Sequence, residues 1–175
     1  MNKFLNKIRS IENEIPITRK IINTILILCF GIVLGTFAKF LDTTASNTLP
    51  FIFEYLDISN FLGRFAIWLL IALYIAIYSH SSIRASLNVL VFFIGMVSSY
   101  YLYSYFVAGF FPKNYAMIWL GFTAISPLLA FVCWYAKGKS KISFILSVII
   151  IAILFKFTFI YGWIYFDVYS ILEVI

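Results

Sequence analysis

The chain has 175 residues, of which 63% are hydrophobic and 11% are charged, and its mean hydropathy is +1.01. Soluble globular domains carry about 25% charged residues, so this composition excludes a soluble domain. The formal net charge of +6 does not indicate a nucleic-acid partner, because Lys and Arg stand mainly in short segments between apolar runs. That distribution is typical of the loops that orient a protein in a bilayer.

Residues 1–20 carry apolar and charged side chains on opposite faces of a helix. The pattern predicts a short amphipathic helix that lies on the cytoplasmic membrane surface and ends at Pro16, with a frayed polar leader as the alternative. No later segment between the apolar runs is long enough to fold alone. Residues 21–175 are therefore predicted to form a single transmembrane domain.

The first predicted span covers residues 21–41, which is long enough for a helix to cross a bilayer, since crossing takes about 20 apolar residues. Gly31 and Gly35 form a GxxxG pair, and helical spacing places Lys39 and Asp42 on the same stripe. Small residues four apart let another helix approach closely, so we predict that both glycines are helix-packing residues and that Lys39 points inward. Chance occurrence of the motif is the alternative.

Four further apolar runs predict spans at residues 61–78, 85–107, 116–136 and 142–161. Residues 162–175 are too few for a comfortable crossing, so we expect them to extend the fifth helix outward or to lie at the interface. A bent sixth span is the alternative. The predicted fold is an all-α polytopic transmembrane helix bundle of five spans plus a C-terminal partial or sixth helix.

The fourth predicted span contains Ser126 and Pro127 near its middle. Proline removes one backbone hydrogen bond, so the sequence predicts a kink at this point. Within a membrane the carbonyl that loses its donor must be satisfied by a neighbouring helix, a serine or water.

Orientation follows from the charges in the loops. With the N-terminus in the cytoplasm, most of the 13 Lys and Arg residues fall in inside segments, and Lys113 is the only one in an outside loop. The acidic residues show the reverse distribution, because only Glu12 and Glu14 fall inside. We therefore expect a multi-pass protein of the cell membrane, inner or plasma, with a cytoplasmic N-terminus.

Three basic residues lie within or at the ends of predicted spans, all in the outer half of the membrane: Lys39, Arg64 and Lys156. Charges at that depth are costly, so they are usually paired or face a water-filled cavity. The sequence predicts that the three converge on a ligand-binding site opposite outer carboxylates, which are Asp42, Asp57 and Asp167. Structural pairing with these carboxylates and snorkelling to the outer headgroups are the alternatives.

The third predicted span ends in SSYYLYSYF, which places several tyrosines near the outer interface. An aromatic belt at the membrane surface is one explanation for such a cluster. Because the rings surround the helix, some must also face inward, so Tyr101 and Tyr105 join the candidate ligand site. Their hydroxyls and ring faces suit an aromatic, amphipathic or cationic ligand.

The sequence offers little for catalysis. His80 is the only histidine and lies in a short predicted cytoplasmic turn, far from the outer serines and acids. There is no HExxH motif, no pair of intramembrane aspartates, no Gly-rich nucleotide loop and no Cys/His cluster. We therefore expect no catalytic residue, no metal and no cofactor.

These patterns predict an integral membrane protein that binds, and takes up, a small solute at an outward-facing site, alone or as the recognition subunit of a multi-component importer. In length, span count, aromatic outer half and the small-residue face of span one, the chain resembles the substrate-binding subunits of energy-coupling-factor vitamin importers. The resemblance implies a partner ATPase and scaffold.

Two other functions compete with this prediction. The first is a non-catalytic accessory or structural subunit that binds a membrane protein partner through the Gly31/Gly35 face. The second is an enzyme acting on a lipid-linked phosphate, with the three basic residues as a clamp. The expected partners are the lipid bilayer, a small-molecule ligand and a membrane protein subunit, and nucleic acid is not among them.

Overall fold

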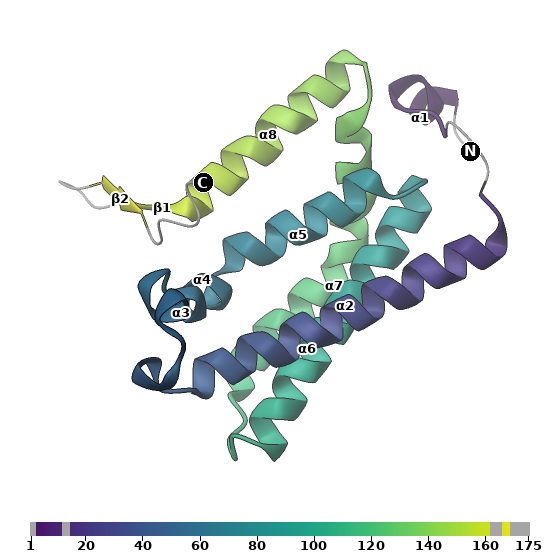
Figure 1. Cartoon of the computed structure of the whole chain (residues 1–175). Helices are drawn as coiled ribbons and strands as arrows, with labels where there is room; N and C mark the ends of the chain where they lie inside the picture. Colours follow the sequence, from purple (N-terminus) through teal and green to yellow (C-terminus); the bar gives the residue numbers. More distant parts are fainter. Residues whose placement is uncertain (1–2, 12–14, 162–165, 169–175) are drawn as a thin grey trace.

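The computed structural model describes residues 3–11, 15–161 and 166–168 (Figure 1). Its elements are α1 (Lys3–Ile8), α2 (Ile17–Thr43), η1 (Ser46–Thr48), α3 (Phe51–Tyr55), α4 (Ile58–Gly63), α5 (Phe65–Tyr78), α6 (Ser82–Phe106), α7 (Lys113–Trp134), η2 (Tyr135–Lys137), α8 (Lys141–Thr158), β1 (Phe159–Tyr161) and β2 (Phe166–Val168). The regular structure in the described residues is therefore helical apart from one short antiparallel strand pair, in which Phe159 lies opposite Val168.

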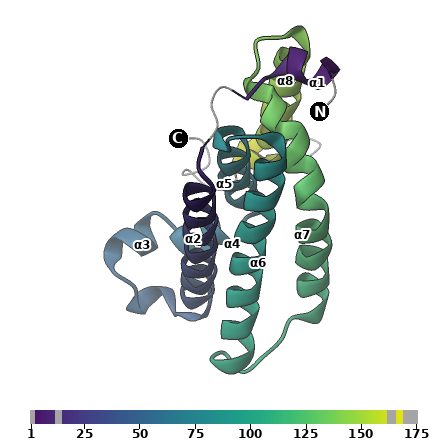
Figure 2. The same cartoon turned by 90° about the vertical axis from the view of Figure 1, so that its right-hand side faces the viewer.

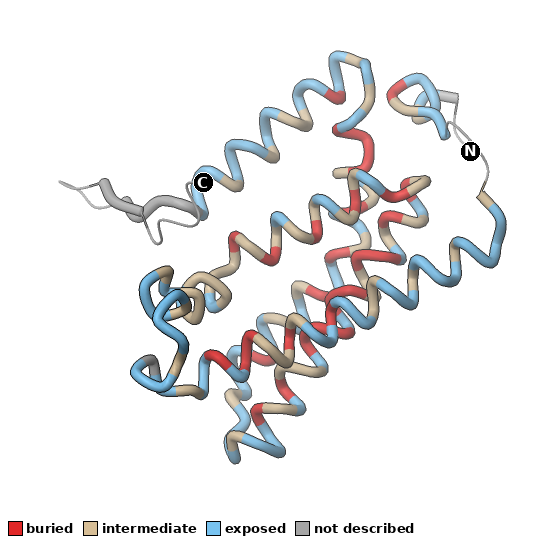
Figure 3. Tube along the Cα trace, in the orientation of Figure 1, coloured by how far each residue is buried: buried red, intermediate tan, exposed pale blue. Residues whose placement is uncertain are grey.

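Helix α6 is the centre of the bundle. It packs against α2, α5 and α7, and α2 and α7 lie on either side of it (Figure 2). Helix α8 rests instead on α5 and on the η2 turn. Buried residues gather where α5, α6 and α7 meet, whereas α8 and the N-terminal half of α2 are largely exposed (Figure 3). Large exposed apolar faces of this kind are what a bilayer would cover.

Three helices in the described part of the chain are long and apolar enough to cross a membrane, namely Ile17–Thr43, Ser82–Phe106 and Lys113–Lys137. They correspond to the first, third and fourth predicted spans. The other two predicted spans are shorter as helices, because α5 has 14 residues and α8 has 18. A straight crossing takes about 20 residues, so the structure supports a membrane-embedded helical bundle without establishing five spans.

The second predicted span, residues 61–78, is not one continuous helix. Helix α4 ends at Gly63 and α5 begins at Phe65, and Arg64 between them has an extended backbone with φ −85° and ψ 152°. The indole of Trp68 donates a hydrogen bond of 2.8 Å to the Leu62 carbonyl. That bond satisfies one of the carbonyls left open where α4 ends, which stabilises the interruption.

The predicted amphipathic helix at residues 1–20 is represented by α1, which has six residues. Ile8 is buried, and its carbonyl approaches Gly138 so closely that a Cβ added there would lie 2.3 Å from the oxygen. The end of α1 therefore packs on the turn between α7 and α8. Residues 12–14 of the predicted segment lie outside the described residues.

The C-terminal segment differs from the predicted helix where it is described. Residues 166–168 form the strand β2, paired with β1 at the end of α8. Strand pairing satisfies the backbone donors and acceptors of this aromatic stretch without a helix. The rest of the predicted interfacial or sixth helix, residues 162–165 and 169–175, lies outside the described residues.

The glycine stripe of α2 packs on α6 of the same chain. A Cβ added at Gly31 would lie 2.4 Å from the Phe92 carbonyl oxygen, and one at Gly35 would lie 2.2 Å from that of Met96. From the opposite side, Gly95 of α6 sits against the backbone of α2. The two helices touch backbone to backbone, as small-residue crossings in membranes do. A separate protein partner, predicted on the Gly31/Gly35 face, would need another surface because α6 already fills this one.

Candidate functional site

Lys39 is the most deeply buried charge that the structure describes. Its side chain is 2% exposed, and Nζ lies 2.6 Å from Oδ2 of Asp42, whose side chain is 51% exposed. Tyr100 of α6 donates a hydrogen bond of 3.1 Å to the same oxygen. The ammonium also lies 5.0 Å from the centre of the Tyr100 ring and 4.5 Å from that of Phe110, both within cation–π range.

This arrangement neutralises Lys39 locally. Lys39 and Asp42 are three residues apart on one helix, so the pair forms whenever α2 is folded. The half-exposed carboxylate keeps contact with water while the ammonium is covered by aromatic rings. Lys39 therefore has a counter-ion within its own helix and does not need an anionic ligand to offset its burial cost.

The other predicted charged residues lie around the same end of the bundle. Asp57 is exposed, and both of its carboxylate oxygens accept hydrogen bonds from Asn60. Arg64 is half-buried at the α4–α5 junction, and Lys156 is exposed near the end of α8. The rings of Phe65 and Phe157, which neighbour these two residues, lie 5.6 Å apart. The structure thus brings the ends of α5 and α8 together.

The convergence predicted for the three basic residues stays a prediction. The contacts that hold Lys39 come from α2, α6 and the loop before α7, whereas Arg64 and Lys156 belong to the α5 and α8 ends. The side chain of Asp167, the last predicted carboxylate, lies outside the described residues.

Tyr101 and Tyr105 line one groove between α6 and α7. Its volume is about 600 Å³, and Ser98, Phe106 and Phe111 also contribute to its walls. Tyr101 is 8% exposed and packs against Phe111, whereas Tyr105 is 60% exposed. The helical spacing of four residues explains why both rings reach the same groove.

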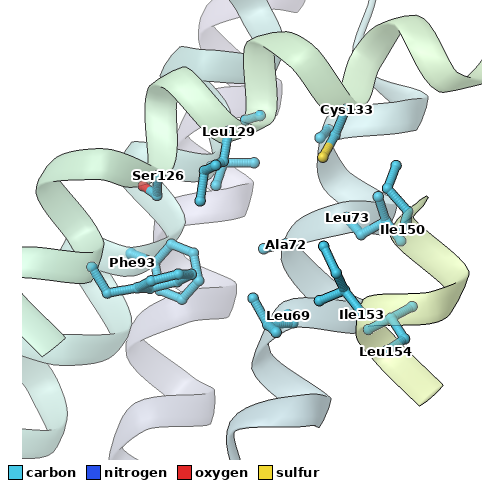
Figure 4. A pocket seen from close by; sticks show the side chains of 14 residues that line it. Leu69, Ala72, Leu73, Phe93, Ser126, Leu129, Cys133, Ile150, Ile153 and Leu154 are labelled. Carbon is cyan, nitrogen blue, oxygen red and sulfur yellow. The ribbon is translucent and has the colours of Figure 1, made fainter. Parts of the chain in front are cut away.

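A separate cavity of about 150 Å³ lies among α5, α6, α7 and α8 (Figure 4). Its walls are almost entirely hydrocarbon and include Leu69, Ala72, Leu73, Phe93, Leu129, Ile150, Ile153 and Leu154. Two lining side chains carry other atoms, the thiol of Cys133 and the hydroxyl of Ser126. The hydroxyl is engaged by the backbone, since it donates to the Thr123 carbonyl at 2.8 Å. The cavity suits an apolar group, which needs no hydrogen-bond partner.

The Ser126 bond also explains how α7 tolerates its proline. Pro127 has no N–H for the carbonyl of Thr123, four residues earlier, and the Ser126 hydroxyl supplies the missing donor. The Pro127 carbonyl in turn accepts a 2.7 Å hydrogen bond from Ser86 of α6. The donor to the Thr123 carbonyl is therefore a serine, which is one of the donors that the sequence analysis named.

A polar network at the opposite end of the bundle was missed by the sequence reasoning. Arg84 of α6 donates through Nη2 to the Lys20 carbonyl at 2.6 Å and to the Thr24 hydroxyl, both in α2. Asn88 joins this group, accepting from Thr24 at 3.1 Å and donating to the Ser79 hydroxyl at 3.0 Å. The four-residue spacing of Arg84 and Asn88 was the available signal, because it puts two polar side chains on one face of an apolar helix.

The same end includes the first described helix. Arg9 donates through Nη1 to the carbonyls of Ile77 and Trp134, and its guanidinium lies 4.0 Å from the centre of the Trp134 ring. The indole of Trp134 donates to the Ser79 carbonyl at 2.7 Å. These bonds tie the N-terminal segment to the ends of α5 and α7.

Comparisons of this chain with protein-family models, with curated proteins and with solved structures gave no match. Among the described residues, no three His, Cys, Asp or Glu side chains are grouped so that they could hold a metal ion.

Proposed function

We propose that the protein is a non-catalytic, multi-pass membrane protein that binds a small apolar or amphipathic molecule inside its helix bundle. The observation that supports this proposal is the cavity of about 150 Å³ among α5, α6, α7 and α8. The only hydroxyl among its lining residues, that of Ser126, is already hydrogen-bonded to the backbone. An apolar ligand or the end of an acyl chain matches such walls, whereas a charged solute would lose its hydration without compensation.

The charge at Lys39 supports this choice over a charged solute. Its ammonium is paired with Asp42 at 2.6 Å and covered by two aromatic rings. A phosphate clamp or anion site built on Lys39 would first have to break that pair. The enzyme alternative, which needs such a clamp, is correspondingly less supported.

The location and orientation belong to the proposal as well. We place five spans in the cell membrane, with the N-terminus in the cytoplasm. The helices α5 and α8 are shorter than the others, and each crosses the membrane together with the elements next to it in the chain. The support is the gathering of Arg9, Arg84 and Lys137 at one end of the bundle, with Asp42 and Asp57 at the other. Uptake of the bound molecule, alone or within a multi-component importer, is the transport form of this function.

The test is photolabelling of the purified full chain in detergent with a diazirine-bearing fatty acid. We expect labels on peptides of α7 and α8 that line the cavity, with competition by unlabelled fatty acid. Ala72→Leu adds bulk directly into the cavity and should reduce that labelling. Ala124→Leu makes the same change at an exposed position of α7 and should not.

Two outcomes would count against the cavity as a ligand site. One is labelling spread evenly over exposed helix faces, as expected of probe dissolved in the detergent micelle. The other is equal labelling of the two alanine variants, because only Ala72 lines the cavity.

A second candidate function is that of an accessory subunit, and the exposed apolar surface of α8 favours it. Phe144 is 71% exposed and Ile151 is 64% exposed, although α8 contacts only part of the bundle with its other face. A partner helix could cover this surface as well as lipid does. Phe144→Ala and Ile151→Ala together should then reduce recovery of a co-purified membrane partner, while fatty-acid labelling of the cavity stays unchanged.

A further inference from the structure

A groove of about 600 Å³ opens at the end of the bundle opposite Lys39, between the start of α2 and the α5–α6 turn. Its polar part is lined by Arg19, Asn23, His80, Arg84 and Asn88. Its apolar part is lined by Leu26, Ile27, Tyr74 and Ile75. The start of α2 and the turn between α5 and α6 lie at the same end of the molecule in Figure 1.

The polarity changes in order along the groove. On α2, Arg19, Asn23, Leu26 and Ile27 follow one another at helical spacing, so a basic residue, an amide and two aliphatic residues share one face. On the facing side, the α5–α6 turn carries His80, and the preceding helix contributes two tyrosines and an isoleucine, which are Tyr78, Tyr74 and Ile75. A molecule with one anionic end and one hydrocarbon end fits this sequence of surfaces.

Arg84 provides a positioned cation in the groove. Its hydrogen bonds to the described residues all use Nη2, which donates to the Lys20 carbonyl, the Thr24 hydroxyl and the Asn88 amide oxygen. Within the described residues, neither Nη1 nor Nε has an acceptor, so two donor positions of the held guanidinium remain open. A fixed guanidinium with open donors is well suited to a phosphate oxygen.

No described carboxylate neutralises this end. The single ion pair found in the described ranges is Lys39 with Asp42. The described acidic side chains, Asp42, Glu54 and Asp57, belong to the end of α2 and to the α3–α4 segment, which lie at the opposite end (Figure 1). Arg84, which is half-buried, and Arg19 line the same groove, and among the described residues no carboxylate lies beside them, which favours binding of an external anion.

We propose that this groove binds the phosphate of an anionic phospholipid, with its acyl chain along the apolar wall. Arg84 and Arg19 contact the phosphate, and Leu26, Ile27 and Ile75 contact the chain. Basic pockets between transmembrane helices on the cytoplasmic side are suited to anionic headgroups. A free phosphate would use the basic end alone, so the continuous apolar wall is what assigns the site to a lipid.

The test is native mass spectrometry of the full chain, released from detergent after incubation with phosphatidylglycerol or phosphatidylcholine. We expect phosphatidylglycerol to be retained and phosphatidylcholine to be lost. Each basic residue near a membrane surface changes anionic lipid affinity by about fivefold, so Arg19→Gln and Arg84→Gln should each weaken retention by about that factor. Lys139→Gln removes an exposed charge at the same end, outside the groove, and should leave retention unchanged.

Arg19→Gln keeps the test decisive if Arg84→Gln unfolds the protein. The Arg19 side chain is exposed and makes no hydrogen bond in the part of the chain that the structure describes, so its loss leaves the helix contacts intact. Leu26→Gln places an amide on the apolar wall and should also weaken phosphatidylglycerol retention, because the acyl chain lies there.

Three results would overturn the assignment. Equal loss of retention in Arg19→Gln and Lys139→Gln would show attraction by net charge only. Equal retention of the two phospholipids would show that the basic end is not used. Displacement of phosphatidylglycerol by millimolar inorganic phosphate, with Leu26→Gln behaving as the unchanged protein, would identify a free-anion site.

Discussion

Gly35→Ile is the sharpest test of the α2–α6 contact. A Cβ at this position would lie 2.2 Å from the Met96 carbonyl oxygen, 2.4 Å from the Ser99 hydroxyl and 2.9 Å from the Met96 carbonyl carbon. The serine side chain can rotate away, but the Met96 backbone is held in the middle of α6. The substitution therefore forces the two helices apart, and a branched isoleucine adds further atoms beyond Cβ.

The expected cost follows from overpacking a close contact. Inserting extra methylene groups into a tightly packed interior typically costs about 1–3 kcal/mol, and backbone atoms on the facing side place this site toward the upper end. For a chain of this size, each kcal/mol lowers the melting temperature by about 2–4 °C. Separation of the helices would also lengthen the hydrogen bonds between α2 and α6 at both ends of α2, which adds to the loss of stability.

The assay is thermal unfolding of the purified protein in detergent, compared with Gly121→Ile. Gly121 is exposed within α7, and an added Cβ there meets nothing within 4 Å. Replacing a mid-helix glycine there removes a helix penalty of about 1 kcal/mol or less, so stability should stay level or rise. Equal destabilisation by the two substitutions would mean that no close crossing exists at Gly35.

Three other experiments test separate parts of the structure. Asp42→Asn removes the counter-ion of Lys39 and should lower the unfolding free energy, measured by thermal unfolding at low salt. The loss should lie between about 1 kcal/mol, as for exposed ion pairs, and about 3–5 kcal/mol, as for fully buried ones. A change near zero would show that the aromatic rings suffice to stabilise the Lys39 ammonium. Ser126→Ala removes the donor to the carbonyl that proline leaves free and should cost about 1–3 kcal/mol by the same assay, whereas an unchanged melting temperature would show that water or another group replaces it. For topology, Lys139→Cys should resist and Asn47→Cys should accept an impermeant thiol reagent on intact cells, and the reverse pattern would invert the orientation.

The inward face of α2 could be predicted from the sequence because it depends on helical spacing alone. Gly31, Gly35 and Lys39 stand four residues apart, and in the structure all three are buried on the side of α6. The spacing of residues along α2 does not indicate which other helix packs against this face. The Tyr100 hydroxyl reaches Asp42 across 58 positions of sequence, and only the packing of two helices determines that pairing.

The charged site illustrates the opposite case. The sequence prediction grouped Lys39, Arg64 and Lys156 by their depth in the predicted spans. Depth alone does not determine where a side chain lies in the plane of the membrane. Rotation of each helix about its axis decides whether side chains at one depth face one another, and long-range packing sets that rotation. An aspartate three residues further along the same helix also offers Lys39 a partner that needs no tertiary contact. Local pairing therefore prevails at Lys39.

The polar contacts between α2 and α6 gain a common explanation from their positions. Asp42 with Tyr100 joins the two helices at one end, and Arg84 with Thr24 joins them at the other. Between these ends, α2 and α6 touch at the glycine crossing. The helix surfaces there are apolar and therefore chemically like the lipid tails. Apolar packing in a bilayer discriminates weakly between neighbouring registers, because a helix shifted by one turn still presents hydrocarbon to hydrocarbon.

A polar pair, in contrast, loses its partner when the register shifts. A slip of one turn is about 5.4 Å, well beyond hydrogen-bond distance, and would leave polar groups unsatisfied at both ends at once. The two polar ends and the close crossing thus specify one alignment of α2 on α6. That alignment in turn sets the width of the basic groove at the start of α2, so the packing of this helix pair and the proposed lipid site depend on the same contacts.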